Sequence, residues 1–93
     1  MATWSFLTNH GKVLLCIAQD PTVRLRDIAQ RVSITERRAF QIVDELTTSE
    51  YVVKVKVGRR NHYQILEHAL LPDAIVREQA VGEVLRVISG RKI

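Results

Sequence analysis

The sequence predicts a small α+β fold that is mainly helical and contains one β-hairpin. Three observations lead to this prediction. Apolar residues recur every three or four positions before residue 50 and again after Pro72, which is typical of amphipathic helices. Between Val53 and Ile65 the period changes to two, around a turn that contains Gly58. With 93 residues, the chain is long enough for one domain with a modest core and too short for two.

The first predicted helix runs from about Thr8 to Gln19. Thr8 is of the residue type that favours the N-cap, and Pro21 disfavours helical geometry in the residue before it. The centre of this helix, Val13 to Ala18, is apolar on every face. We therefore expect it to be covered on more than one side.

Two further helices predict a helix-turn-helix. A short extended piece, residues 22–25, leads into a helix of roughly residues 26–32. After a break of about three residues, Thr35 caps a third helix over residues 36–50. The expected buried positions are Ile28, Ala29 and Val32 in the second helix, and Ala39, Ile42, Val43 and Leu46 in the third.

A β-hairpin is predicted next. From Val53 to Val57 valines alternate with two lysines, which indicates a half-buried strand with its valines inward and its lysines outward. The turn is expected over Gly58 to Asn61. The returning strand then places Tyr63 and Ile65 inward, with the residues between and before them outward.

The segment after Pro72 predicts a last helix over residues 73–89, in which Gly82 costs up to ~1 kcal/mol relative to Ala. Together with the first helix it carries more apolar surface than one small core requires. We expect this surface to pair two protomers in a homodimer; the alternative is that the last helix folds back onto its own domain. The apolar stripe consists of Ile75, Val81, Val84, Leu85 and Ile88.

The net charge of +4 is concentrated in one segment. Between Tyr51 and Leu66 there are four basic residues and no acidic one, while the rest of the chain carries ten of each. Such a concentration of positive charge suits a polyanion such as nucleic acid. On charge alone, a solvated basic hairpin that binds nothing specific is an equal alternative.

Several classes of function are not expected. There is no glycine-rich phosphate loop, no context for a Ser or Cys nucleophile and no acid pair in an evident pocket, so we expect neither an enzyme nor a cofactor. His10, His62 and His68 are scattered, and Cys16 lies in the apolar stretch of the first helix, so no metal site is expected.

The sequence also bears on where the protein acts. The longest apolar run, Val13 to Ala18, is far short of the roughly 20 residues that cross a bilayer, so no membrane span is expected. The first residues lack the pattern of a secretion signal, and the single Cys16 cannot form an intramolecular disulfide. A cytoplasmic location is the expectation that follows.

The stretch "RLRDIAQRVSITERRAFQIVDELTTSEYVVKVKVGRRNHYQI" resembles the winged helix-turn-helix domain of bacterial and archaeal transcription regulators, especially the MarR-like and ArsR-like groups. The likeness covers about Leu7 to Leu66. Its most specific part, "G-R-x-x-x-Y-x-I", is filled by Gly58, Arg59, Tyr63 and Ile65 and looks like the wing of ArsR-like repressors.

This resemblance implies a homodimer that binds double-stranded DNA, with the third helix in the major groove and the wing on the backbone or in the minor groove. It assigns residues 1–70 to the DNA-binding domain and 71–93 to a C-terminal helix for dimerisation. Arginine and glutamine near a helix start can bond guanine and adenine edges, which points the same way. The predicted DNA-binding residues are Thr35, Arg37, Arg38, Gln41, Lys54, Lys56, Arg59, Arg60 and Asn61.

Two positions depart from the family pattern. Glu50 stands where the family often has a glycine, so the third helix is expected to end with a different geometry. Phe40 occupies a position that is usually polar, and it either contacts a thymine methyl or folds back toward the wing. The alternative function is a protein-interaction or assembly module on the same fold. No small-molecule effector site can be read from the sequence.

Overall fold

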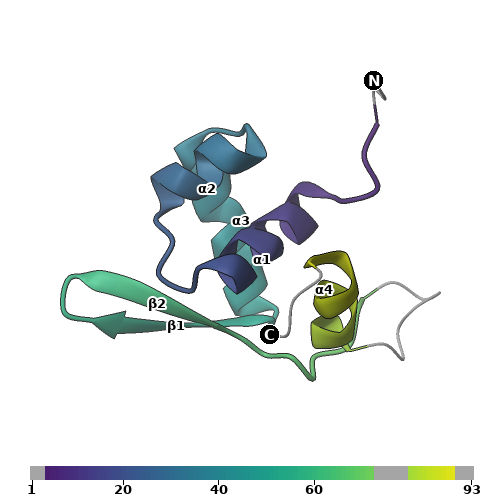
Figure 1. Cartoon of the computed structure of the whole chain (residues 1–93). Helices are drawn as coiled ribbons and strands as arrows, with labels where there is room; N and C mark the ends of the chain where they lie inside the picture. The colour runs from purple at the N-terminus through teal and green to yellow at the C-terminus, as the bar shows by residue number, and fades with distance from the viewer. Residues whose placement is uncertain (1–3, 73–79, 90–93) are drawn as a thin grey trace.

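The computed structural model describes residues 4–72 and 80–89. These residues form four helices and one two-stranded antiparallel sheet, which confirms the predicted α+β class. In Figure 1 the first three helices pack together, the hairpin extends below them, and the last helix lies beside the first. The elements are α1 (Asn9–Gln19), α2 (Leu25–Val32), α3 (Glu36–Thr48), β1 (Val52–Val57), β2 (Arg60–Ile65) and α4 (Val81–Ser89).

Helix α1 lies at the centre of the fold. Its N-cap is Thr8, as predicted, because the Thr8 hydroxyl oxygen accepts a hydrogen bond from the Gly11 N–H at 3.1 Å. Val13 and Ile17 are almost completely buried. The helix contacts α2, α3, β2 and α4, so the expectation that it is covered on more than one side is confirmed.

The predicted extended piece at residues 22–25 is confirmed only at Arg24, which has extended backbone geometry, because a turn occupies Thr22 and α2 begins at Leu25. The Asp20 carboxylate accepts hydrogen bonds from the Thr22 hydroxyl at 2.8 Å and the Thr22 N–H at 3.0 Å, and these bonds lower the pKa of Asp20. The Val23 N–H donates to the Asp20 carbonyl, so two backbone donors are bound within the turn. The Pro21 carbonyl accepts a bond from the Tyr63 N–H at 2.8 Å, which attaches the turn to β2.

Helices α2 and α3 are joined by a short break, as predicted. Ser33 adopts a left-handed conformation there, with φ of 63°. The Thr35 hydroxyl oxygen then accepts a bond from the Arg38 N–H at 3.0 Å and caps α3. All seven apolar positions predicted to be buried are buried: Ile28, Ala29, Val32, Ala39, Ile42, Val43 and Leu46.

The end of α3 keeps the geometry that a glycine normally supplies. Glu50 has φ of 64°, and its N–H donates to the Thr47 carbonyl at 3.1 Å. The next N–H, that of Tyr51, donates to the Leu46 carbonyl at 2.9 Å. This pair of bonds is a Schellman motif, so the expectation of a different helix end is wrong.

Replacing Glu50 by Gly should stabilise the protein. A side chain in the left-handed region costs roughly 1–2 kcal/mol, part of which is offset because glycine is freer in the unfolded chain. We expect a net gain of about 1 kcal/mol and a rise in Tm of about 4–8 °C, measured by thermal unfolding. Glu50→Ala is the matched control, because it keeps the Cβ and should gain little. Equal Tm values for wild type and Glu50→Gly would contradict this account.

In β1 the side chains point to the opposite faces from those predicted. The register pairs Lys54 with Tyr63, and residues directly opposite in an antiparallel pair share a face. Tyr63 and Val52 are buried, whereas Val55 is 46% exposed. The lysines of β1 therefore share the inner face, and the three valines at positions 53, 55 and 57 lie on the outer face. The prediction of an inward Tyr63 is confirmed.

The reason for this reversal is the pairing of lysine with the buried Tyr63. Val57 pairs with Arg60, so only Gly58 and Arg59 form the turn, and Gly58 supplies the positive φ of 63°. The predicted turn was two residues longer, but a shift of two residues keeps every side chain on its face and leaves a lysine opposite Tyr63 in either register. An inward Tyr63 therefore requires inward lysines, and the predicted inward valines are wrong.

Helix α4 packs on its own domain. Val81 and Leu85 are buried, and α4 contacts α1. Gly82 permits this packing, because a Cβ there would lie 2.7 Å from the Glu67 Cβ. Ile88, predicted to lie on the buried stripe, is exposed, and Val87 is 83% exposed.

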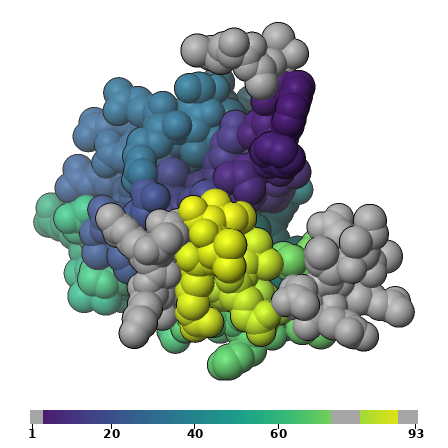
Figure 2. Space-filling model, turned by 45° about the vertical axis from the view of Figure 1, so that its right-hand side comes forward, coloured from purple at the N-terminus to yellow at the C-terminus, as the bar shows by residue number. Residues whose placement is uncertain are grey.

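The outer side of α4 forms part of the surface, as Figure 2 shows. Near the other end of the chain, Trp4 and Phe6 are also exposed and stack edge to face with ring centres 4.9 Å apart. The predicted Ile75 lies outside the described residues. None of the helices described is long and apolar enough to cross a membrane.

Candidate nucleic-acid interface

The exposed side of α3 carries two of the predicted site residues, Arg37 and Gln41. They are four residues apart, so they lie one turn apart on the same side of the helix. Both are exposed, because the apolar positions of α3 occupy the opposite side. Asp44 is exposed near them and is the acidic residue of this face.

Arg38 differs from its neighbour Arg37 because it is engaged within the protein. One guanidinium nitrogen lies 3.4 Å from the Gln41 amide oxygen and 3.5 Å from a Glu45 carboxylate oxygen. The same carboxylate oxygen lies 3.3 Å from the His10 ring on α1. These exposed pairs are individually weak, yet they direct Arg38 toward α1. Sequence reasoning missed this chain, because His10 and Glu45 are far apart in the sequence.

Thr35 has a structural role at the start of α3. Its hydroxyl oxygen accepts the capping bond from Arg38, which leaves the hydroxyl proton available as a donor. Thr35 is exposed, so this donor faces solvent at the end of the helix where unpaired N–H groups gather.

The inner face of the hairpin meets α3 across a narrow groove. The groove is lined by Phe40 and Asp44 of α3 and by Lys54 and Asn61 of the hairpin, with Leu25, Val43, Thr47 and Tyr63 completing it. Lys56 pairs with Asn61 and shares this face. Phe40 is 53% exposed and borders the groove, so it is turned toward the hairpin without being buried by it.

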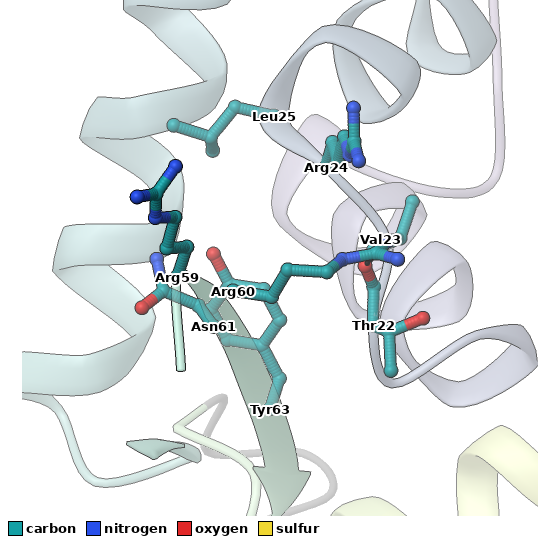
Figure 3. A pocket seen from close by; sticks show the side chains of 8 residues that line it. All are labelled: Thr22, Val23, Arg24, Leu25, Arg59, Arg60, Asn61 and Tyr63. Carbon is teal, nitrogen blue, oxygen red and sulfur yellow. Dashed lines mark hydrogen bonds between the residues drawn. The ribbon is translucent and has the colours of Figure 1, made fainter. Parts of the chain in front are cut away.

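The turn of the hairpin separates the two arginines. Arg59 lies in the turn and is exposed, whereas Arg60 begins β2 and its guanidinium donates to the Thr22 carbonyl at 3.0 Å. In Figure 3 the two side chains leave the hairpin in different directions, and Arg60 extends toward Thr22 and Val23. The structure therefore places Arg59 at the tip and fixes Arg60 against the turn before α2.

A cleft of about 330 Å³ lies between the hairpin turn and the start of α2 (Figure 3). Arg24, Arg59 and Arg60 line it, together with Thr22, Val23, Leu25, Asn61 and Tyr63. Sequence reasoning missed Arg24, which is the N-cap of α2. Its position two residues before a predicted helix was the only signal available in the sequence.

A larger hollow of about 480 Å³ lies between α1, the end of α3 and the segment before α4. Its apolar lining includes Leu14, Leu46, Leu71 and Val81, and its polar lining includes His10 and Glu45. No local pattern indicates this hollow, because it forms where three separate segments meet.

Cys16, His62 and His68, for which no metal site or chemistry was predicted, line neither the groove, the cleft nor the larger hollow. Cys16 is buried in α1, and burial raises the pKa of its thiol. His62 is exposed on the outer face of the hairpin, and His68 is exposed in the following loop. Among residues 4–72 and 80–89, no three His, Cys, Asp or Glu side chains gather as metal ligands would.

Comparisons with protein-family models, curated proteins and solved structures found no match to this chain. The case for a function therefore depends on the geometry and charge of its own residues.

Proposed function

We propose that the protein is a sequence-specific, double-stranded DNA-binding transcription regulator of the winged helix-turn-helix type that acts in the cytoplasm. The single observation that carries the proposal is the groove between α3 and the hairpin. Lys54 of the hairpin lines it, and the exposed Lys56 shares the hairpin face of Lys54. The other basic residues in the proposal lie on the same two elements outside the groove lining: Arg37 and the half-buried Arg38 of α3, and Arg59 and Arg60 at the hairpin turn.

In this proposal α3 enters the major groove. Arg37 and Gln41 face outward one turn apart, and their side chains suit paired hydrogen bonds to guanine and adenine edges respectively. The hairpin is the wing, and its arginines and lysines contact the phosphate backbone or the minor groove. Thr35 and Asn61 add uncharged contacts at the start of α3 and beside the turn.

The homodimer is part of the same proposal. What supports it is the apolar surface left bare near both ends of the described chain, at Val87 and Ile88 of α4 and at Trp4 and Phe6. Pairing of these surfaces would set two α3 helices about one DNA turn apart, roughly 34 Å.

The alternative is a protein-interaction or assembly module, and one observation favours it. The outer face of the hairpin presents Val53, Val55 and Val57 to solvent, which suits an apolar partner better than a polyanion. Such a module would bind duplex DNA weakly and without a strong dependence on salt.

Titration of random duplex DNA across a salt series tests the proposal. Six positively charged contacts to DNA per protomer predict that log affinity falls with log salt with a slope of about −5, and about twice that for a dimer. Fluorescence anisotropy of a labelled duplex between about 50 and 200 mM salt measures this slope. A flat response, or no binding at the lowest salt, would contradict the proposal and favour the interaction module.

A further inference from the structure

We propose that the cleft between the hairpin turn and the start of α2 binds a phosphate group of the DNA backbone, and that Arg24 is a further DNA contact. This inference rests on the proposed function and goes beyond the nine residues that the sequence nominated. It gives the cleft of about 330 Å³ a specific ligand, a phosphodiester held between Arg24 on one wall and the hairpin arginines on the other.

The chemistry of the cleft is that of an anion site. Three guanidinium groups line it and no carboxylate does, so far as the described residues go. The nearest acidic groups in sequence are Asp20, whose carboxylate is bonded to Thr22, and Asp27, further along the first turn of α2. Neither belongs to the lining, and although the Asp20 carboxylate attracts Arg60 from outside it, no carboxylate of the lining neutralises Arg24 or Arg59.

The three arginines are held to different degrees. Arg60 is fixed by its bond to the Thr22 carbonyl and still has other N–H donors available. The side chains of Arg24 and Arg59 are exposed and donate no hydrogen bond to the described part of the protein, although the Arg24 carbonyl accepts a bond from the Ile28 N–H within α2. A guanidinium without a protein partner at the rim of a cleft is free to bind a phosphate oxygen in a paired geometry.

The position of the cleft favours DNA as the source of the phosphate. The cleft shares Leu25, Asn61 and Tyr63 with the groove between α3 and the hairpin, so the two hollows adjoin. A DNA strand whose bases face α3 would carry its backbone along this side of the helix. Contacts of this kind fix the register of a protein on the duplex without reading sequence.

Arg24→Ala compared with Arg26→Ala tests the inference. Both variants remove one exposed arginine near the start of α2, but only Arg24 lines the cleft. In the salt series, Arg24→Ala should lower the steepness of the slope by about 0.9 per protomer and weaken binding roughly 8-fold at about 0.1 M salt. Arg26→Ala should change neither quantity measurably, and thermal unfolding checks that both variants remain folded.

The outcomes separate the cleft from the proposed function. If the wild type binds duplex DNA and Arg24→Ala and Arg26→Ala reduce its affinity by the same factor, the cleft proposal is wrong while the proposed function stands. If the wild type binds no duplex at all, the proposed function fails, and with it the assignment of the cleft to DNA.

Inorganic phosphate is the probe that distinguishes a free anion from the backbone. Phosphate should shift the NMR side-chain Nε–H signals of Arg24 and Arg59 in the wild type, and the Arg59 shift should shrink in Arg24→Ala. Such shifts combined with equal DNA binding by Arg24→Ala and Arg26→Ala would make the cleft a site for a free anion and overturn its assignment to DNA.

Discussion

Replacement of both Arg59 and Arg60 by Ala should weaken binding to every duplex by roughly 60-fold at about 0.1 M salt and reduce the steepness of the salt slope by about 2 per protomer. The reason is the loss of two phosphate contacts on the wing, each of which releases counterions from DNA. Anisotropy titrations of random and specific duplexes should show the same proportional loss, because phosphate contacts carry no sequence information.

The single variants refine this result. The Arg59 side chain lies in the turn without a protein partner among the described residues. Arg59→Ala should therefore cause about half of the double variant's loss in log affinity and leave stability unchanged. Arg60 also donates to the Thr22 carbonyl, so Arg60→Ala should in addition lose up to about 1 kcal/mol of stability.

A charge-matched control removes two positive charges away from the hairpin. Lys12→Ala combined with Arg26→Ala should leave the slope near that of the wild type, since neither residue borders the groove or the arginine-lined cleft. If the double variant of Arg59 and Arg60 binds as tightly as wild type, the hairpin turn is not a DNA contact.

Replacement of Arg37 and Gln41 by Ala should abolish discrimination between a specific site and random duplex. Each paired contact to a base edge contributes about 1–3 kcal/mol of discrimination, so losing both removes at least about 30-fold in the affinity ratio. Affinity for random duplex should fall by less, because only the charge of Arg37 contributes to it. Competition titrations of a selected site against a scrambled duplex measure this ratio.

Arg38→Ala provides the comparison on the same helix. The Arg38 guanidinium is bonded to the side chains of Gln41 and Glu45. We therefore expect Arg38→Ala to reduce discrimination between a specific site and random duplex less than Arg37→Ala does. Alanine is the best helix former, so α3 should remain intact in all of these variants. An unchanged ratio for the variant at Arg37 and Gln41 would rule out α3 as the reading helix.

Local sequence rules were sufficient for α1, α2 and α3 but not for α4, because Ala80 of the predicted last helix forms a β-bridge with Leu70 and the helix begins at Val81. Thr8 and Thr35 were predicted as caps from residue type alone, and both accept the expected N–H bond. The spacing of apolar residues identified the buried sides of α2 and α3, because a helix that packs on a core must bury one stripe. These features depend on interactions within a few residues, which a sequence displays directly.

The hairpin shows where the same reasoning failed. Alternating Val and Lys in β1 indicates an amphipathic strand but does not fix which face is buried. The pairing of Lys54 with the buried Tyr63 decides it, and it places the lysines beside the groove instead of away from the domain. This correction strengthens the proposed site, because it brings Lys54 to the same groove as α3.

The parts of the site that the sequence did not indicate all join distant segments. Arg24 meets the hairpin only because the Pro21 carbonyl bonds to Tyr63 and the Thr22 carbonyl bonds to Arg60. Similarly, Glu45 connects Arg38 to His10 across two helices. No local pattern records such contacts, so they emerge only from the packed fold.

Selection of binding sites from random duplexes by the wild-type protein tests the central claim most directly. The account predicts enrichment of one sequence motif, with two symmetric half-sites whose centres lie about 10 base pairs apart, as a dimer with two reading helices requires. Recovery of unrelated sequences at low salt, with no motif enriched over the starting pool, would contradict sequence-specific recognition by α3.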